Sequence, residues 1–271
     1  MHRRGIQILV PIPRISPDSM FRVRDQCLTL DSEINFDLSQ STRWDPPYLL
    51  PEEVFSFKAL FSHLLSYSSL FDDLNTPTGF GVLIPKITKF KQGYPLPTSF
   101  PDHIPALEYA LPTLARVFQA CIVHDFTEFL RSSENLIGLG DGLTPSGDDF
   151  IGGMLFSIVT LQNTYSQFQG FSRYDLELFL DSSSRRTNLI SYTLLKEHAA
   201  GHASETIHRF IIALLTGKPQ EFTRRLVSYI VRVGHSTGWD TLAGLWAGML
   251  LILDDDASPM FKKNSSTFRQ P

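Results

Sequence analysis

Hydrophobic residues recur at helical spacing through most of the chain after residue 105. The apolar positions lie three or four residues apart and short polar turns separate the segments, which is typical of amphipathic helices that pack together. Pro112 is expected to break or kink the first of these segments. The predicted helical segments are Ala106–Leu130, Asp149–Leu161, Tyr174–Leu180, Thr187–Ala200, Ala203–Leu215, Gln220–Val233 and Thr241–Leu253. This pattern predicts a helical bundle in the C-terminal part of the chain.

The first 100 residues show a different pattern. Short runs rich in β-branched and aromatic residues, bounded by Pro, Gly or Asp, predict extended segments at Ile6–Ile12, Phe21–Leu30 and Gly79–Ile84. One helix is expected over Val54–Leu65, because Pro51 and the two acidic residues after it are typical of a helix start.

These two patterns meet at a proline-rich segment, residues 91–105, which is the expected domain boundary. We therefore predict an α+β fold in which a β-rich N-terminal part precedes a mostly helical C-terminal bundle. The expected division is a β-rich domain over residues 1–100, an α-helical domain over residues 101–258, and a frayed tail over residues 259–271 that lacks apolar periodicity.

Composition limits the class of ligand. The 271 residues carry 24 Lys and Arg against 28 Asp and Glu, a formal net charge of −4, and basic and aromatic residues do not cluster. We therefore expect no nucleic-acid partner and no membrane association, since no apolar run is long enough to span a bilayer. The first residues lack a signal-peptide cleavage site, so a cytoplasmic protein is expected. Cys27 and Cys121 are expected to be reduced thiols, and the ligand to be a small molecule.

One stretch near the middle of the chain cannot be the interior of a helix or strand. Residues 138–149, GLGDGLTPSGDD, combine four glycines, one proline, two hydroxyl side chains and three carboxylates. An apolar run follows at once, so the stretch predicts a tight loop at a helix start. Ser146 or Thr144 is expected to cap that helix, with Asp148 and Asp149 in its first turn. Free backbone N–H groups at such a helix start could hold an anion.

A second stretch repeats this order. Residues 237–244, TGWDTLAG, align with residues 146–153, SGDDFIGG, as a hydroxyl residue, Gly, any residue, Asp and a later Gly on the same helix face. That Gly permits close approach of another helix or of a ligand. Two capped helices with glycine packing notches would be the purely structural interpretation. The repetition favours an internal duplication that brings both helix starts to one cleft.

These two loops resemble the AllH family of oxamate carbamoyltransferase subunits, over about residues 135–252. The matching residues of the first loop are Gly140, Gly142, Leu143, Thr144, Pro145, Ser146, Asp148 and Asp149, with Gly153. Those of the second are Gly234, His235, Ser236, Thr237, Gly238, Asp240 and Thr241, with Gly244. Between the loops, Ser191, Leu194, Ala199 and Gly201 fit the family's pattern. The resemblance implies a carbamoyltransferase subunit of allantoin (purine nitrogen) catabolism that works beside other subunits. Its substrates would be oxamate or oxalurate and carbamoyl phosphate.

The two loops supply the candidate catalytic residues, Asp149, Asp240 and His235. The two carboxylates could orient an ammonium or amide group, relay a proton, or hold Mg²⁺; in the structural interpretation each merely stabilises its own helix start. His235 could donate to an oxyanion or act as an acid or base near neutral pH. No other metal is expected, because Gly201 interrupts the spacing of His198 and His202. No organic cofactor is expected, because no Lys follows the glycines of the first loop and no βαβ pattern precedes it.

Substrate or anion binding is expected from glycines and polar side chains of both loops and of the connecting helix. These residues are Gly140, Gly142, Thr144, Ser146, Gly147, Asp148, Ser191, Ser236, Thr237 and Gly238. Two other functions fit the same residues, namely a non-catalytic scaffold or regulatory subunit of a multi-subunit enzyme and a metal-dependent amide hydrolase.

Overall fold

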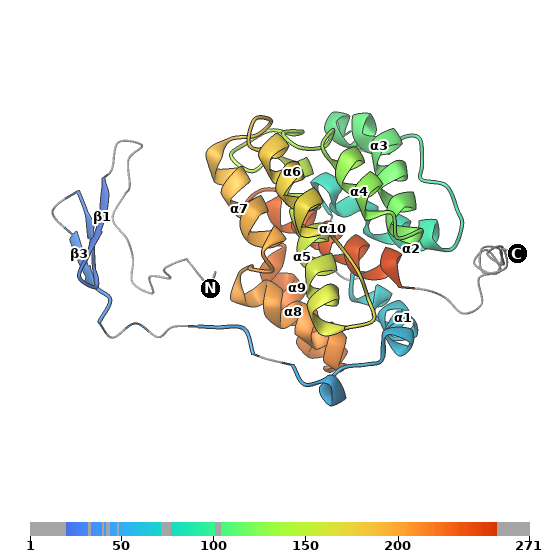
Figure 1. Ribbon diagram of the computed structural model, residues 1–271, viewed down its shortest axis with the longest axis horizontal. Coiled ribbons are helices and arrows are strands. Elements are labelled where there is room, and N and C mark those ends of the chain that lie inside the picture. Colours follow the sequence, from blue (N-terminus) through green and yellow to red (C-terminus); the bar gives the residue numbers. More distant parts are fainter. Residues whose placement is uncertain are drawn as a thin grey trace, which may run out of the picture.

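The computed structural model describes residues 20–31, 34–39, 41, 44–47, 49–71, 77–100 and 104–253. Within them a small sheet stands beside a large helical body (Figure 1). The predicted extended segment at residues 6–12 and the predicted tail lie outside the described residues.

The sheet has three antiparallel strands, β1 (Phe21–Arg24), β2 (Cys27–Leu30) and β3 (Ile34–Asp37), in the order β1-β2-β3. Asp25 and Gln26 connect the first two strands with φ angles of 43° and 65°, which is typical of the two-residue turns whose twist matches that of a hairpin. Alternate residues of β2 are buried. The extended segment predicted over residues 21–30 is therefore confirmed.

Helices make up most of the remaining described chain, and the α+β class is confirmed. The first group is η1 (Pro51–Glu53), α1 (Phe57–Ser66), η2 (Ser68–Phe71), η3 (Gly79–Leu83) and α2 (Ile84–Lys91). The second group is α3 (Pro105–Ile122), α4 (Phe126–Ser133), α5 (Ser146–Thr164), α6 (Arg173–Ser183), α7 (Leu189–Ala199), α8 (Glu205–Thr216), α9 (Gln220–Ile230) and α10 (Thr237–Ile252).

Two local predictions were wrong. Residues 79–84, expected to be extended, form η3 and the start of α2, because this backbone lies against α10: a Cβ on Gly81 would lie 2.9 Å from Cβ of Trp239. The helix predicted over residues 106–130 is two helices, and the break is not at Pro112, which lies inside α3. The chain turns instead at His124, with φ of 57°, and Asp125 then caps α4 by accepting from the N–H of Glu128 at 2.9 Å.

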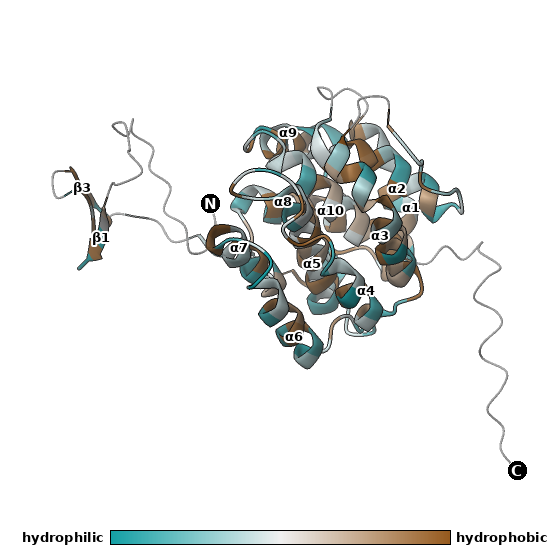
Figure 2. Ribbon diagram, turned by 90° about the horizontal axis from the view of Figure 1, so that it is seen from above, coloured by the Kyte–Doolittle hydropathy of each residue, from teal (hydrophilic) through white to brown (hydrophobic). Residues whose placement is uncertain are grey.

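Helix α10 is the centre of the body. Every residue from Gly238 to Ile252 is buried, and the helix lies among its neighbours in both views (Figures 1 and 2). A helix that is apolar all round needs neighbours on every side. It packs most extensively on α5 and also contacts η3, α2 and α3. The elements on both sides of the proline-rich segment, α2 and α3, therefore share one core around α10.

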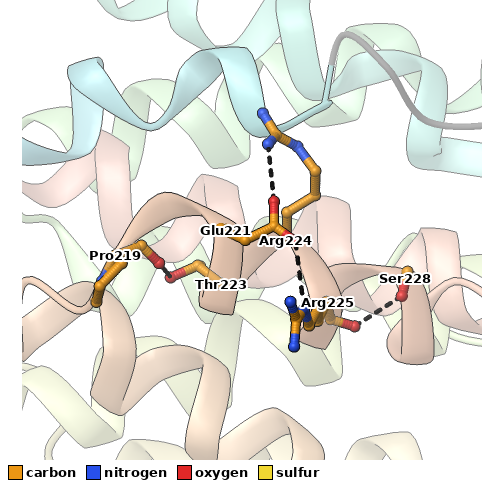
Figure 3. A network of polar contacts seen from close by, with 6 residues as sticks. All are labelled: Pro219, Glu221, Thr223, Arg224, Arg225 and Ser228. Atoms are coloured by element: carbon orange, nitrogen blue, oxygen red, sulfur yellow. Dashed lines mark hydrogen bonds and ion pairs between the residues drawn. The ribbon is translucent and has the colours of Figure 1, made fainter.

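Helix α9 precedes the second loop and carries its own polar network (Figure 3). Glu221 lies 3.6 Å from Nη1 of Arg224 and 3.2 Å from Nε of Arg225, and Thr223 donates to the carbonyl oxygen of Pro219 at 3.3 Å. Exposed pairs of this spacing contribute only about 0.3–0.5 kcal/mol each to helix stability. The buried face of α9, rather than this network, therefore fixes its place in the body.

Candidate functional site

The two predicted loops meet in space. Oγ1 of Thr144 lies 2.8 Å from Oγ1 of Thr237, and Oγ of Ser146 lies 3.5 Å from Oγ of Ser236. Each contact joins one residue of the first loop to one residue of the second. The starts of α5 and α10 therefore lie side by side, as the repeat predicted.

The helix crossing behind the loops has the symmetry of an internal duplication. A Cβ on Gly153 would lie 2.4 Å from the carbonyl oxygen of Thr241, and a Cβ on Gly244 would lie 2.0 Å from the carbonyl oxygen of Phe150. In the aligned stretches Gly153 corresponds to Gly244 and Phe150 to Thr241, so each helix makes the same contact on the other. These reciprocal contacts align the start of α5 with the start of α10.

A hollow of about 780 Å³ opens in front of the two loops. Its lining comes from both loops, from the segment before η3 and from the start of α3. The lining residues are Thr78, Gly79, Ile104, Pro105, Ala106, Gly140, Asp141, Gly142, Leu143, Thr144, Ser146, His235, Ser236 and Thr237. We call the side chains of Thr144, Ser146, Ser236 and Thr237 the hydroxyl floor.

Asp149 lies behind this floor, 6% exposed, and does not itself line the hollow. Burial raises the pKa of its carboxyl to about 8, mainly because an ionised carboxylate loses its hydration there. Hydrogen bonding from Thr144 and Thr237 lowers the pKa, whereas the nearby charges of Asp240 and Asp148 raise it. At neutral pH this carboxyl therefore mostly holds a proton.

Asp240 occupies the equivalent place at the start of α10 and is fully buried. Its Oδ1 accepts from the backbone N–H of Phe80 at 2.5 Å. Burial raises its pKa to about 6, while the Phe80 amide and the hydroxyls of Ser146 and Ser236 lower it. The two carboxyls interact, so the apparent pKa values of about 6 and about 8 belong to the pair, which holds about one proton near neutral pH.

One oxygen of each carboxyl is left unused. The Oδ2 atoms of Asp149 and Asp240 are buried and accept no hydrogen bond from the described part of the chain. An unpartnered buried acceptor costs free energy that a purely structural cap would avoid. A functional group at a binding site is the ordinary reason for such a cost.

A third segment, which sequence reasoning missed, completes the site. Gly79 has φ of 54°, and a Cβ there would lie 2.3 Å from Oδ1 of Asp240. This close approach brings the N–H of Phe80 onto the carboxylate, and Thr78 donates to the carbonyl oxygen of His235 at 3.2 Å. The sequence offered one signal for this approach, the glycines on either side of Phe80, but both lie within the run over residues 79–84 that was expected to be extended.

Three of the remaining candidates lie at the hollow. His235 is exposed and lines it next to Ser236. Gly140 and Gly142 line the first loop with φ angles of 114° and 96°, conformations that favour glycine. A Cβ on Gly140 would lie 2.8 Å from the backbone nitrogen of Ser146, whereas one on Gly142 would meet nothing within 4 Å.

Asp148 and Ser191, expected to bind substrate, bond each other away from the hollow. Oδ2 of Asp148 accepts from Oγ of Ser191 at 2.6 Å and from the hydroxyl of Thr187, and Oδ1 accepts from the N–H of Gly138 at 2.5 Å. Neither residue lines the hollow. This arrangement follows from helix geometry, because adjacent residues point about 100° apart and only one of Asp148 and Asp149 can face the hydroxyl floor. Asp148 fastens the start of the first loop to α7.

The helix starts also differ from the prediction. The N-cap of α5 is Pro145, with no side-chain cap, rather than Ser146 or Thr144. Gly147 and Gly238 donate their N–H groups to the carbonyl oxygens of Leu139 and Val233, both at 2.9 Å. These two amides therefore serve the fold and are not free for an anion. Glycine is required at both positions by backbone packing, because a Cβ on Gly147 or Gly238 would lie 2.0 Å from the carbonyl oxygen of Leu136 or Ile230, respectively.

Among the described residues, no three His, Cys, Asp or Glu side chains come together in a way that could hold a metal ion. Mg²⁺ stays a hypothesis that rests on the carboxylate pair. Within the same residues, no helix has the length and apolar character needed to cross a membrane.

Comparison with known proteins points to one family. The family model described as oxamate carbamoyltransferase subunit AllH matches residues 136–249. The match includes both loops and almost all of α5 to α10, and it confirms the resemblance to the AllH family. No solved structure matches the chain.

Proposed function

We propose that this chain is a carbamoyltransferase subunit that binds carbamoyl phosphate and oxamate or oxalurate in the hollow between the two loops. The match to a family of oxamate carbamoyltransferase subunits supports the subunit role. The observation that carries the substrate site is the meeting of both loops over two buried carboxylates with unused oxygens. The pathway we propose for it is allantoin (purine nitrogen) catabolism.

In the proposed reaction the amide nitrogen of oxamate attacks the carbonyl carbon of carbamoyl phosphate. The new C–N bond forms as the C–O bond to phosphate breaks, and the attacking nitrogen loses a proton. His235 is the proposed acceptor of that proton, because it lines the hollow, is exposed, and is the kind of side chain that exchanges protons near neutral pH. The hydroxyl floor and the glycine-rich loop are proposed to orient the substrates.

The charge of the hollow supports a multi-subunit enzyme. Its lining, within the described residues, contains Asp141 and no Lys or Arg, although both proposed substrates are anions. Carbamoyl transfer needs positive charge near the phosphate that leaves. We propose that another subunit of the same enzyme supplies it.

An exposed apolar edge lies where such a subunit would approach. Leu143 of the first loop is 70% exposed, Leu189 78% and Ile190 51%. Nδ2 of Asn188 donates to the carbonyl oxygen of Leu143 at 2.9 Å, which keeps the three together beside the hollow. We call Leu143, Leu189 and Ile190 the rim. Exposed apolar groups of this size at a functional site are typical of protein interfaces.

Ligand-dependent stability tests this proposal. The melting temperature of the chain is measured with carbamoyl phosphate, oxamate or phosphate, alone and with the other subunits present. Binding to the folded state raises the melting temperature. The matched pair is His235→Gln, at the hollow, and His124→Gln, whose ring contacts the carbonyl oxygen of Ile252 instead. The activity of the assembled enzyme is measured for both variants. Carbamoyl transfer should be lost with His235→Gln and kept with His124→Gln.

The two alternatives predict different results. A non-catalytic scaffold would show no ligand shift by itself, and His235→Gln would leave the activity of the assembled enzyme unchanged. A metal-dependent amide hydrolase would lose activity in chelator and would release ammonia from amides in the absence of carbamoyl phosphate. Full transfer activity in chelator would exclude the hydrolase.

A further inference from the structure

Two buried carboxyls face each other between α5 and α10. Asp149 lies one helical turn before Gly153, and Asp240 lies one turn before Gly244, so each Asp shares a helix face with its glycine. The glycine faces are in contact: a Cβ on Gly153 would lie 2.8 Å from the backbone nitrogen of Leu245 on α10, and one on Gly244 would likewise touch the backbone of α5. The two carboxyls therefore occupy the layer next to the crossing, between these helices.

The hydroxyl floor closes this layer toward the hollow. Ser146 lies three residues before Asp149, and Thr237 lies three residues before Asp240, so each hydroxyl is on the helix face of its carboxyl. Gly79 closes a further side, since a Cβ there would lie 3.0 Å from Cγ of Asp240. The carboxyls are therefore enclosed by the helix crossing, by hydroxyl groups and by the backbone at the start of η3.

Each carboxyl in this layer has one oxygen to spare. Oδ1 of Asp240 accepts from the N–H of Phe80 at 2.5 Å, but Oδ2 of Asp240 and Oδ2 of Asp149 have no partner within the described residues. Asp149 is only 6% exposed and Asp240 is fully buried. The hollow in front of them has no Lys or Arg in the part of its lining that the structure describes. Two buried carboxylates that face each other need a positive partner, because an unpaired buried charge is costly.

The spacing of the floor suits a metal ion that prefers oxygen ligands. The layer and its floor offer two free carboxylate oxygens and four hydroxyl oxygens. The hydroxyl oxygens of Thr144 and Thr237 lie 2.8 Å apart, and those of Ser146 and Ser236 lie 3.5 Å apart. Neighbouring ligands of an octahedral ion lie about 1.4 times the metal–oxygen distance apart, which gives about 2.9 Å for Mg²⁺ and about 3.3–3.7 Å for Ca²⁺. Both hydroxyl pairs are therefore spaced like neighbouring ligands of such an ion.

We propose that Asp149 and Asp240 hold a divalent cation of the Mg²⁺ or Ca²⁺ class between the starts of α5 and α10, with hydroxyl oxygens of the floor or water as further ligands. Two carboxylates neutralise a divalent charge, and such ions select oxygen ligands. A site of this composition needs only two acidic side chains, so it agrees with the absence of a cluster of three His, Cys, Asp or Glu among the described residues. In chelator, which removes the ion, the pair keeps the proton described above.

This inference goes beyond the proposed function and does not depend on it, since the two carboxylates and the hydroxyls all belong to this chain. The ion would add positive charge at the inner end of the hollow, whereas the subunit proposed above would approach at the rim. Loss of transfer activity in chelator would then fit both a transferase and a hydrolase, and ammonia release would identify the hydrolase.

Cation-dependent stability of the whole chain tests the site. The protein is stripped with chelator, and its melting temperature is measured with MgCl₂, CaCl₂ or KCl at matched ionic strength. At one hundred times its dissociation constant, the preferred divalent ion should raise the melting temperature by about 5 °C or more, and K⁺ should not. Mn²⁺, followed by electron paramagnetic resonance, should bind once per chain and be displaced by the preferred ion. The relative responses to Mg²⁺ and Ca²⁺ identify that ion.

Variants assign the ion to the carboxyl pair. Asp149→Asn and Asp240→Asn each remove one charged ligand and should weaken Mn²⁺ binding by at least about tenfold. Asn at position 240 keeps an oxygen that accepts from the N–H of Phe80, so the fold should survive, and circular dichroism checks this. Asp148→Asn, next in the chain but bonded to protein donors, and Asp141→Asn, at the lining of the hollow, are the matched controls. Both should bind Mn²⁺ as the unchanged protein does.

The outcomes separate this inference from the proposed function. No shift with either divalent ion and no bound Mn²⁺ would overturn the inference and leave the proposed function untouched. A loss of Mn²⁺ binding in Asp141→Asn, with binding kept in Asp149→Asn and Asp240→Asn, would also overturn it, because the ion would then lie at the open lining. A response to K⁺ as large as that to a divalent ion would do the same. Cation binding without any response to carbamoyl phosphate or oxamate, alone or with the other subunits, would uphold the inference and contradict the proposed function.

Discussion

Asp148 and Asp149 are neighbours in the chain with opposite bonding. Both oxygens of Asp148 accept hydrogen bonds from protein donors, whereas Oδ2 of Asp149 is buried without a partner in the described part of the chain. Helix α5 turns the first carboxylate toward α7 and the second toward the hydroxyl floor. Asp148 therefore stabilises the fold, whereas the burial of Asp149 at the candidate site lowers the stability of the protein.

The first prediction concerns pH. The pKa of Asp149 is raised from 3.8 to about 8 by folding, so between these values the folded protein holds a proton that the unfolded chain has lost. Stability from this group is complete below pH 3.8 and falls as pH rises toward 8, by up to about 1.4 kcal/mol per pH unit. Asp149→Asn removes this dependence. Urea unfolding of the variant and of the unchanged protein measures the difference between their free energies of unfolding. This difference should change in favour of the variant from pH 5 to pH 8. A difference that does not vary with pH would contradict the raised pKa of Asp149.

The second prediction concerns Asp148, whose replacement should lower the stability of the protein instead of raising it. Asp148→Asn and Ser191→Ala each break a buried hydrogen bond to a charged group, so each should lower the free energy of unfolding by about 1.5–3 kcal/mol. Ligand affinity should not change, since neither residue lines the hollow. The urea midpoint and a titration with carbamoyl phosphate measure the two effects. Reduced affinity with unchanged stability would restore the original assignment of these residues to the substrate site.

The third prediction tests the crossing of α5 and α10. Replacing an exposed helical Gly by Ala normally stabilises a protein by about 1 kcal/mol. At Gly153 and Gly244 the added methyl group would meet a backbone carbonyl oxygen at 2.4 and 2.0 Å, so each Ala variant should instead lose about 3 kcal/mol of stability. Gly93→Ala is the control, because its methyl group meets nothing within 4 Å and only the positive φ of 92° opposes it. A gain in stability at Gly153 or Gly244 would refute the close crossing.

The sequence was sufficient for features that depend on local pattern. The repeat of Gly, Asp and a later Gly predicted both helix starts, their meeting, and the close approach of the helices at Gly153 and Gly244. The β-branched and aromatic residues of 21–30 predicted an extended segment, although not the turn at Asp25 and Gln26 that makes it a hairpin. Each of these features is set by residues within a few positions of one another, where periodicity and backbone freedom are decisive.

What the sequence could not supply depends on contacts between distant segments. The glycines beside Phe80 indicate that its backbone can approach another group closely, but nothing near them indicates that this group is a carboxylate 160 residues later. The choice between Asp148 and Asp149 required the direction of α7. The burial of Asp149 and Asp240 behind the hydroxyls required the packing of both loops. Tertiary contacts decide such features, and one sequence does not record them.

The fourth prediction treats Asp149 and Asp240 as one unit. Asn keeps the shape of each side chain and removes its charge, so both single variants should fold and should reduce carbamoyl transfer by about tenfold or more. If the two share one function, Asp149→Asn combined with Asp240→Asn should lose little more activity than either alone. Independent helix caps would instead leave activity nearly intact, with small and additive effects on stability. Steady-state kinetics of the assembled enzyme, with carbamoyl phosphate varied, measure this coupling.

The last prediction concerns the rim. Leu189 is 78% exposed at the start of α7, and its neighbour Asn188 binds the backbone of the first loop. If another subunit covers the rim and brings positive charge to the hollow, Leu189→Asp should weaken association with that subunit by at least about tenfold, because a charge buried at an apolar interface stays unpaired. The fold should be unchanged, since the side chain is mostly in solvent.

Leu178→Asp on α6, 53% exposed, is the matched control and should associate normally. Sedimentation of the chain with its other subunits measures association, and transfer activity should fall in proportion. Equal effects at Leu178 and Leu189 would show that the apolar surface in general, and not the rim, determines assembly.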